Sequence, residues 1–240
     1  MSDPVVPGPV VSVAHLDIRL VDGPLPFAER AAAAIAEGWR RTVAAKPALY
    51  DGPILLFSGI AVDGDRLVAL GHRARFSALM ALVEDGGAES PGANLFGAAA
   101  IVSSDGAVIL GRMGAHTAFP GVVKFVGGTP DEADLRPDGT IDIAGSIARE
   151  TAEETGLVAA EAAVDPRFLV VADGPFLAIV QVLRMSETAA ALIARIDAFN
   201  AAEAEPELAG AVAVRHGDRL DGVDMPGYTR AIVADLLTRL

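Results

Sequence analysis

Apolar and polar residues follow two different periods along the chain, which together predict a mixture of strands and helices. Runs rich in Val, Ile and Leu, bounded by Gly, Pro or Asp, predict strands at residues 10–19, 54–62, 66–73, 95–103, 107–113, 122–128, 167–173, 176–185 and 211–215. Alanine-rich segments with an apolar stripe predict helices at 26–45, 75–85, 142–156, 186–200 and 225–240. Since the two kinds of element do not alternate strictly, we predict an α+β fold or an α/β/α sandwich rather than a doubly wound sheet.

Turn and capping residues sharpen several of these boundaries. The segment Asp63-Gly64-Asp65 predicts a first hairpin, and Ser104-Asp105-Gly106 predicts a second one. The helix at 142–156 has Asp142 in position to cap its start and Gly156 just past its end. Ser186 is a possible cap for the helix that follows it, and the polar segment 129–140 with its two prolines predicts a loop.

A small, polar segment rich in Gly and Pro, DGGAESPGAN at 85–94, is the best candidate for a linker. After it the hairpin pattern begins again. We therefore predict two domains, a small N-terminal α+β domain at 1–92 and a second domain at 93–240.

Composition narrows the class of protein. Hydrophobic residues make up 52% and charged residues 21% of the 240 positions, which is typical of a soluble globular protein. The net charge of -13 predicts no nucleic-acid partner and no binding to anionic membranes. The absence of cysteine excludes disulfides, thiolate zinc sites and cysteine nucleophiles. No basic, apolar signal segment begins the chain and no apolar run is long enough to span a bilayer, so we expect a cytoplasmic protein.

Three glutamates crowd the end of one predicted helix, in the segment Arg149–Leu157, RETAEETGL. Glu150, Glu153 and Glu154 stand at i, i+3 and i+4, so they share one arc of the helix surface. Like charges at these spacings repel, and the helix dipole disfavours anions near the C-terminus. Either the cluster is a solvated helix end, or a hard cation such as Mg²⁺, which prefers oxygen ligands, resolves the repulsion.

The same residues resemble the Nudix box, G-x5-E-x7-R-E-U-x-E-E-x-G-U, in which U is bulky and apolar. Positions 149 to 157 match the second half of the box, except that Thr151 stands at the first U. Gly127 and Gly128 resemble the glycines that open the box, and they follow a predicted strand. The resemblance covers roughly residues 95–240 and implies a Nudix-like α/β/α sandwich.

The chain departs from the box in one respect. The loop between Gly128 and the helix is longer than the motif allows, and the position eight before Arg149 is Ile141, not a glutamate. Glu132 or Asp142 could replace the missing carboxylate, or nothing does. An inactive binding module that kept the fold therefore stays open as an alternative, and so does a purely structural partner protein.

The family resemblance also implies a function. Nudix enzymes hydrolyse nucleoside diphosphates linked to another group, so Glu150, Glu153 and Glu154 would be catalytic metal ligands for Mg²⁺, with Mn²⁺ possible, and Arg149 would orient a glutamate. A base could come from the cluster or from Glu203, Glu205 or Glu207, although an ordinary acidic loop is the simpler interpretation of 203–207. Family dimers make a homodimer possible.

The N-terminal part has a looser resemblance to the Nudix branch that cleaves UDP-glucose and UDP-galactose. It rests on a helix carrying Trp39, then KPALYDGP, then a hairpin. It implies cleavage of a nucleotide sugar to a sugar 1-phosphate and UMP, with ADP-ribose or another nucleotide sugar as the alternative.

Several cations could help to hold a diphosphate in an acidic protein. Arg112, His116 and Lys124 flank the candidate site in sequence, and we expect Arg112 and Lys124, with Gly127 and Gly128, to bind substrate. His72, Arg73 and Arg75 follow the first hairpin; they could reach a phosphate, but an exposed basic turn is the simpler interpretation. Trp39 is expected to pack in a core rather than to stack on a base.

Overall fold

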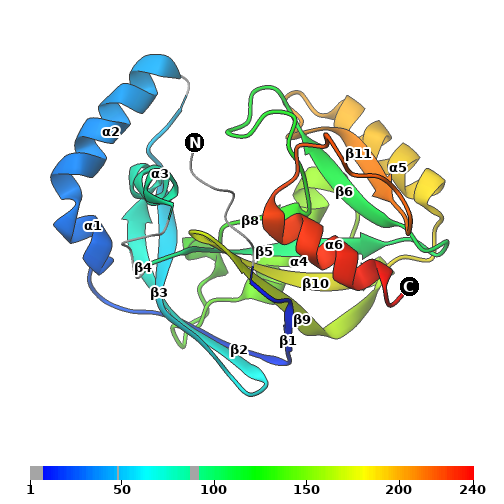
Figure 1. Cartoon of the computed structure of the whole chain (residues 1–240), viewed down its shortest axis with the longest axis horizontal. Coiled ribbons are helices and arrows are strands. Elements are labelled where there is room, and N and C mark those ends of the chain that lie inside the picture. The colour runs from blue at the N-terminus through cyan, green and yellow to red at the C-terminus, as the bar shows by residue number, and fades with distance from the viewer. Residues whose placement is uncertain (1–7, 48, 87–91) are drawn as a thin grey trace.

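The computed structural model describes residues 8–47, 49–86 and 92–240, which form two sheets with helices packed around them (Figure 1). Six strands of the larger sheet follow the order β1-β9-β10-β5-β6-β11, while β7 pairs with β6 and β8 pairs with β5. Their bounds are β1 Val11–Val13, β5 Asn94–Val102, β6 Val108–Met113, β7 Val123–Lys124, β8 Val126–Gly128, β9 Ala163–Asp173, β10 Phe176–Arg184 and β11 Leu208–Val214. Strands β5 and β10 pair in parallel, whereas the other described pairs in this sheet are antiparallel, so the sheet is mixed. The predicted α+β class is confirmed.

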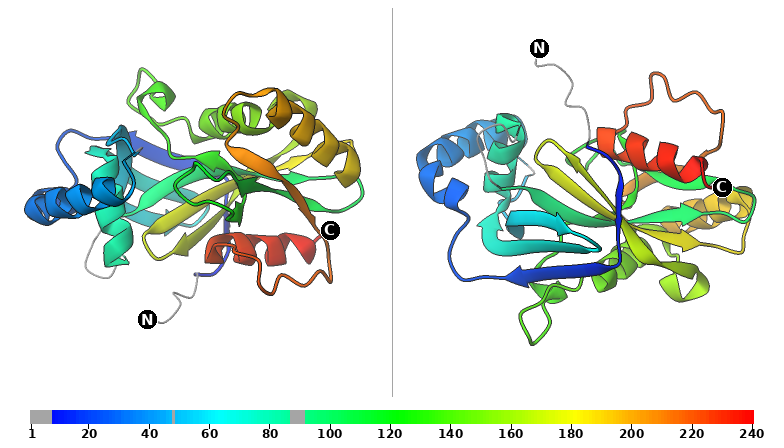
Figure 2. Two further views of the ribbon diagram at one scale, coloured as in Figure 1. Left: turned by 90° about the horizontal axis from the view of Figure 1, so that it is seen from above. Right: turned by 60° about the horizontal axis from the view of Figure 1, so that its bottom comes forward.

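Helices cover both faces of the larger sheet. Helices α4 (Ile143–Thr155) and α5 (Ala189–Ala202) lie on one face and α6 (Gly227–Leu237) on the other (Figure 2). Since strand side chains alternate between faces, Ala99 belongs to the apolar cluster under α4 and α5, whereas Ala98 belongs to the cluster under α6. The result is an α/β/α sandwich with a separate core on each side of the sheet.

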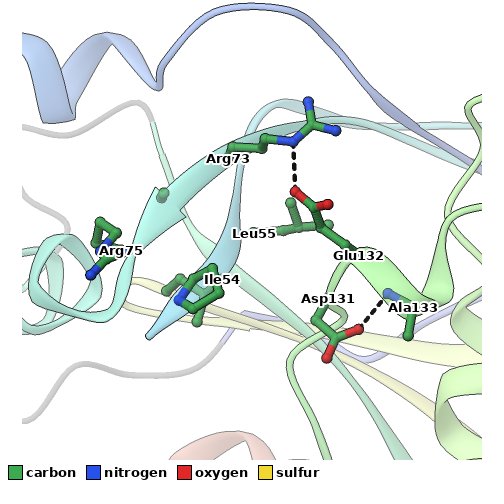
Figure 3. A pocket seen from close by; sticks show the side chains of 9 residues that line it. Ile54, Leu55, Arg73, Arg75, Asp131, Glu132 and Ala133 are labelled. Atoms are coloured by element: carbon green, nitrogen blue, oxygen red, sulfur yellow. Dashed lines mark hydrogen bonds and ion pairs between the residues drawn. The ribbon is translucent and has the colours of Figure 1, made fainter. Parts of the chain in front are cut away.

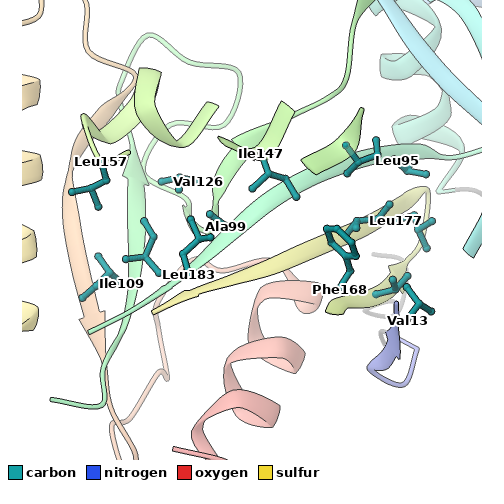
Figure 4. Packing of buried hydrophobic residues seen from close by; sticks show 14 of the residues in the cluster. Val13, Leu95, Ala99, Ile109, Val126, Ile147, Leu157, Phe168, Leu177 and Leu183 are labelled. Atoms are coloured by element: carbon teal, nitrogen blue, oxygen red, sulfur yellow. The ribbon is translucent and has the colours of Figure 1, made fainter. Parts of the chain in front are cut away.

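Small residues on β5 let α4 approach the sheet closely. A Cβ added at Gly97 would lie 2.7 Å from Cγ1 of Ile147 on α4. Figure 4 shows Ile147 over the strands, with α6 on the opposite side of the sheet. The absence of a side chain at Gly97 therefore lets α4 lie this close to the strands.

The smaller sheet has the order β2-β4-β3 and carries the N-terminal helices. Its elements are β2 His15–Leu20, β3 Pro53–Asp63, β4 Arg66–Arg75, α1 Pro26–Arg30, α2 Ala32–Ala45 and α3 Phe76–Asp85. Leu56 packs toward these helices, while Leu55 and Phe57 point the other way and join the apolar cluster that also contains Ile147. The smaller sheet thus shares a core with the sandwich.

The loop between β8 and α4 is docked on the smaller sheet. It contains the 3-10 turn η1 (Glu132–Asp134), and a second such turn, η2 (Ala159–Glu161), follows α4. The backbone N–H of Ile141 donates to the carbonyl of Ile18 at 2.9 Å, and that of Leu20 donates to the carbonyl of Gly139 at 3.0 Å. The C-terminal end of this long loop is therefore held by strand β2.

The structure divides three predicted elements and moves one cap. The strand predicted at 10–19 is two strands, because β1 pairs with β9 and β2 pairs with β4. The helix predicted at 26–45 is interrupted at Ala31, and the strand predicted at 122–128 is interrupted at Phe125. The cap predicted at Ser186 is wrong: Thr188 caps α5, with its hydroxyl accepting from the N–H of Ala191.

Residues 87–91 of the predicted linker lie outside the described part of the chain. The division into domains at 92/93 stays a prediction. Strand β1, from before that boundary, belongs to the larger sheet. None of the helices in the described ranges combines the length and the apolar character that crossing a membrane would require.

Candidate functional site

The end of α4 places two of the three clustered glutamates against the protein interior. The Asp142 side chain accepts from the N–H of Gly145 and caps the start, and Gly156 ends the helix in the left-handed conformation, as predicted. Ile143 and Ile147 are buried against the sheet. Glu150 and Glu154 continue that stripe, because residues three or four apart share a helix face.

Glu154 is a buried carboxylate with an unpartnered oxygen. The residue is only 5% exposed, and its Oε2 atom has no hydrogen-bond partner among the described residues. Burial raises the pKa of Glu154 to about 8, although Lys124 and the backbone N–H of Gly127 oppose that shift. A bare carboxylate in such surroundings is costly unless a cation compensates it.

Glu150 lies between the helix and the glycine pair. Its side chain is 18% exposed, and Nη1 of Arg149 lies 2.8 Å from its Oε1 atom. A Cβ added at Gly128 would lie 2.7 Å from the Glu150 carboxylate, so a larger residue there would displace that side chain. Burial raises the pKa of Glu150, and the positive charge of Arg149 counteracts it.

Glu153 lies on the solvent side of the helix. Its side chain is 58% exposed, and its Oε2 atom lies 3.1 Å from Nη1 of Arg149. Within the described ranges, no three His, Asp or Glu side chains are grouped so as to hold a metal ion. The shared arc expected from the sequence is thus split, with Glu150 and Glu154 inward and Glu153 outward.

A carboxylate that the sequence analysis missed holds Arg149. Both oxygens of Asp134 accept from Nη2 of Arg149, at 3.2 and 3.3 Å, and the Asp134 side chain is only 5% exposed. Neither expected substitute makes this contact, since Glu132 pairs with Arg73 and Asp142 caps α4. The sequence spacing that could have pointed to Asp134 is Asp131-x-x-Asp134, which forms a capping box and so orders this turn.

Gly127 and Lys124 border the two inward glutamates. Gly127 has φ 144°, and a Cβ there would lie 2.2 Å from the carbonyl oxygen of Gly97, so no other residue fits. The Lys124 ammonium lies 3.4 Å from the carbonyl oxygen of Gly127, and its charge lowers the pKa of Glu154. Lys124, Gly127 and Gly128 therefore lie beside the inward carboxylates, and their role in substrate binding stays a prediction.

The acidic segment 203–207 contributes one further carboxylate. The negative charge of Glu207 raises the pKa of both Glu150 and Glu154, which places Glu207 near them. Its backbone carbonyl accepts from the N–H of Gly114 at 2.7 Å, which fixes the segment beside the loop after β6. Glu207 is thus the member of this segment that approaches the site.

Within the described part of the chain, neither Arg112 nor His72 forms an ion pair with the clustered glutamates. Arg112 is exposed on β6, on the face opposite Met113, whose side chain packs in the cluster under α4. His72 is buried, and its ring bonds the Ser58 hydroxyl at 2.8 Å and the Gly23 carbonyl at 3.2 Å, which is a structural role. Trp39 packs edge-on against Phe76.

Arg73 and Arg75 line a cleft of about 610 Å³ between the smaller sheet and η1. Figure 3 shows Arg73 above Glu132, with 2.7 Å between the Arg73 Nε and Glu132 Oε1 atoms. The exposed ion pair links the smaller sheet to the loop that carries Asp134. Arg73 is therefore connected to the candidate site through η1, which carries both its partner Glu132 and Asp134, the partner of Arg149.

A second cleft, of about 530 Å³, opens beside Lys124 and the glycine pair. We call it the α3 cleft, because helix α3 contributes one of its walls. It is lined by Phe76, Leu79, Met80, Val83, Gly86, Asn94, Phe96, Phe119, Val122, Lys124, Gly127, Gly128, Thr129, Asp173, Gly174, Pro175, Phe176, Asp224, Met225, Pro226 and Tyr228. A ligand in this cleft would reach Gly128, which packs on Glu150.

No family model and no curated protein matches the chain. Among solved structures, a bifunctional NMN adenylyltransferase/ADP ribose pyrophosphatase from Francisella tularensis, complexed with AMP and a manganese ion, is similar at 17% identity and a TM-score of 0.39. That match covers 61% of this chain and 42% of the other, so this chain spans less than half of that protein's length.

Two other solved structures have comparable similarity. DR0079 from Deinococcus radiodurans matches at 17% identity and a TM-score of 0.32, over 50% of this chain and 65% of that one. The E. coli ORF135 protein matches at 16% identity and a TM-score of 0.35, over 62% of this chain and 91% of that one. Scores at this level carry no conclusion about function, which therefore rests on the residues themselves.

Proposed function

We propose that the chain is a Nudix-type hydrolase that uses a divalent metal ion to cleave the pyrophosphate of a nucleoside diphosphate compound. The supporting observation is the unpartnered, buried carboxylate of Glu154, next to Glu150 and the glycine pair. Structural carboxylates in a core are normally paired or hydrogen-bonded. An unpaired one beside a cleft is typical of a ligand site.

The residues present fit a hard cation. Glu150 and Glu154 offer carboxylate oxygens, which Mg²⁺ and Mn²⁺ prefer, and Glu153 would join them by leaving Arg149. When bound, such an ion would neutralise pyrophosphate charge and lower the pKa of a bound water. We therefore assign Glu150, Glu153 and Glu154 as the metal ligands and catalytic glutamates.

The other residues at the site have roles that follow from their positions. Arg149 holds Glu150 in place and is itself held by Asp134. Lys124 supplies positive charge for a phosphate, and Gly127 and Gly128 let one approach the backbone closely. Glu207 is the base that we favour, because it lies near both inward glutamates without belonging to α4.

For the substrate we propose a nucleotide sugar, with UDP-glucose or UDP-galactose cleaved to a sugar 1-phosphate and UMP. This choice rests on the resemblance of the N-terminal segment around Trp39 to that branch. ADP-ribose is the alternative within the same reaction class, and Arg112 would have to move to contribute to binding either compound.

A binding module that has lost catalysis is the second candidate. Two observations favour it: the upstream glutamate of the motif is absent, and Glu153 is paired with Arg149 away from the other two carboxylates. A module of this kind would bind nucleotide without turnover.

Phosphate release in the presence of a coupled phosphatase separates these candidates, because the phosphatase acts on the monoester products and not on the intact diphosphate. UDP-glucose, UDP-galactose and ADP-ribose would be assayed with Mg²⁺, with Mn²⁺ and with EDTA. We expect metal-dependent turnover of at least one compound. No turnover, together with a ligand-induced rise in melting temperature, would replace the hydrolase by the binding module; neither effect would exclude both.

A further inference from the structure

Building on the proposed function, we propose that helix α3 of the N-terminal unit is the specificity wall of the α3 cleft. In this view the cleft holds the uncharged, flat ring of the nucleoside, and α3 determines the size of ring that fits. The N-terminal unit would therefore take part in substrate selection.

One face of α3 is directed at the cleft. The lining residues Phe76, Leu79, Met80 and Val83 have spacings of three, four and seven, which is one stripe of a helix. Leu82, by contrast, is fully buried among residues of the smaller sheet and the N-terminal helices. Leu79 belongs to the same cluster, and Phe76 and Val83 pack against it, so this stripe of α3 lies at the border between its own unit and the cleft.

The opposite wall of the cleft is aromatic. Phe96 of β5 and Phe176 of β10 line it, and Tyr228 contacts Phe96 edge-on with 5.1 Å between the ring centroids. Phe119 lines the cleft and is an exposed aromatic residue. Apolar and aromatic surfaces on two sides suit a flat ring better than a hydroxyl-rich sugar, because the ring faces make the larger apolar contact.

The charges along the cleft orient such a ligand. Among the described lining residues, Lys124 is the one with a cationic side chain, and it lies at the end next to Gly127 and Gly128. Asp173 lies elsewhere in the lining, where it accepts from the N–H of Tyr228 and caps α6. Phosphate is therefore favoured near Lys124, while the ring extends toward α3, where a second anionic group would find no partner.

The protein carries a natural reporter for this cleft. Trp39 is the only tryptophan in the sequence, and it contacts Phe76 edge-on with ring centroids 6.1 Å apart. Since Phe76 lines the cleft, a ring that displaces it would change the emission of Trp39. Binding can thus be followed in the full chain without metal and without turnover.

The test is to titrate UMP, AMP and ribose 5-phosphate into the wild type, Val83→Phe and Val62→Phe while following Trp39 fluorescence and melting temperature. Val62 is exposed on the first hairpin and lies outside the described lining, so it is a matched control for the same substitution. We expect Val83→Phe to raise the Kd of UMP and AMP at least about tenfold, with ribose 5-phosphate and Val62→Phe unaffected.

Equal loss of ribose 5-phosphate binding, or no change in Val83→Phe, would overturn the proposal. If Val83→Phe does not fold, Met80→Ala decides: a wider cleft should shift the ratio of AMP to UMP affinity toward AMP at least about threefold, and an unchanged ratio would refute the wall. Nucleotide binding that responds to Val83→Phe, without any hydrolysis, would refute the proposed hydrolase function but not the role of α3. Hydrolysis together with unchanged nucleotide binding in Val83→Phe would refute the role of α3 but not the hydrolase function.

Discussion

Glu154 is destabilising by its position, which suggests that it is kept for binding. A buried carboxylate with an unpartnered oxygen loses the stabilisation that water gives to its charge. The N–H of Gly127 and the charge of Lys124 replace only part of that stabilisation. Proteins commonly tolerate such a loss of folding stability where their activity requires a polar group in apolar surroundings. The neighbouring Glu153, which is exposed and paired, carries no such cost.

Replacing Glu154 by Gln should therefore stabilise the metal-free protein and inactivate it. We expect the free energy of unfolding without metal at pH 7 to rise by roughly 1–3 kcal/mol, because folding no longer requires a carboxyl that is ionised in the unfolded chain to take up a proton. We expect kcat to fall at least about 100-fold, the lower range for loss of a group that acts in the chemical step. Denaturant unfolding and the coupled phosphatase assay measure the two effects.

Glu153→Gln is the comparison for that variant. It should leave the stability of the metal-free protein nearly unchanged, because the exposed pair with Arg149 is worth at most about 1 kcal/mol. It should still lower kcat by about 100-fold if Glu153 turns inward to the metal. A Glu153→Gln enzyme with normal turnover and a normal Mg²⁺ requirement would remove Glu153 from the ligand set.

Asp105 shows how one side chain fixes the position of several elements. Hydrogen bonds from the Ser103 side chain, from the N–H of Ala189 at the start of α5 and from Arg215 after β11 hold the pKa of Asp105 well below its usual range. The turn between β5 and β6 is thereby tied to two elements that are distant in sequence.

The lowered pKa of Asp105 makes part of the stability dependent on pH. A folded-state pKa below the unfolded value means that the stabilisation is present at neutral pH and is lost as the pH falls below about 4. Asp105→Asn should therefore lower the melting temperature at pH 7, and the gap to wild type should narrow at pH 3. A gap of constant size at both pH values would contradict this account.

At the scale of elements, the support of α4 comes from the loop before it. Asp134, in η1, holds Arg149, which in turn holds Glu150; the same loop is docked on β2 and linked to β4 by the Arg73–Glu132 pair. A loop longer than the usual motif is thus ordered by the N-terminal sheet. The position of α4 depends on this contact between the loop and the smaller sheet.

Asp134→Asn tests this support. Loss of the Asp134 charge should lower the free energy of unfolding by about 1.5–3 kcal/mol, the range for a hydrogen bond to a charged group, because Arg149 is one-third exposed and keeps Glu150 and Glu153 as partners. It should also weaken Mg²⁺ binding, because Arg149 then draws more strongly on Glu150 and Glu153. Asp138→Asn is the control, since Asp138 accepts hydrogen bonds from Thr140 within an exposed turn and does not contact Arg149 in the described structure. Equal Mg²⁺-induced shifts in melting temperature for both variants would contradict the support role.

At the scale of the whole molecule, the two sheets share one apolar cluster. Ile18, Leu55 and Phe57 of the smaller sheet belong to the same cluster as Leu95 and Ile147 of the sandwich. Since separating the sheets would expose this surface to water, the two units cannot lose contact without a large loss of hydrophobic stabilisation.

We therefore expect the full chain to unfold in one cooperative transition, with the calorimetric enthalpy equal to the van't Hoff enthalpy. Differential scanning calorimetry, repeated with fluorescence from Trp39 in the N-terminal unit, measures this directly. Two separated transitions, with Trp39 reporting only the first, would show that the predicted domains 1–92 and 93–240 are independent in stability.

Features that depend on local chemistry could be predicted from the order of residues alone. The start and end of α4 followed from Asp142 and Gly156, because a cap acts within one turn of a helix. The two hairpins followed from their turn residues for the same reason. The concentration of carboxylates at 150–154 was visible from the spacing of charges on a helix, whereas the choice of a metal site over a solvated helix end came from the resemblance to the Nudix box.

Features that depend on contacts between residues distant in the chain became visible in the folded structure. It separated the inward Glu150 and Glu154 from the outward Glu153, supplied Asp134 as the partner of Arg149, and placed α3 on the cleft. It also assigned β1 and β2 to different sheets. Burial and pairing are set by the packing of whole elements, and the order of residues along one segment does not contain that information.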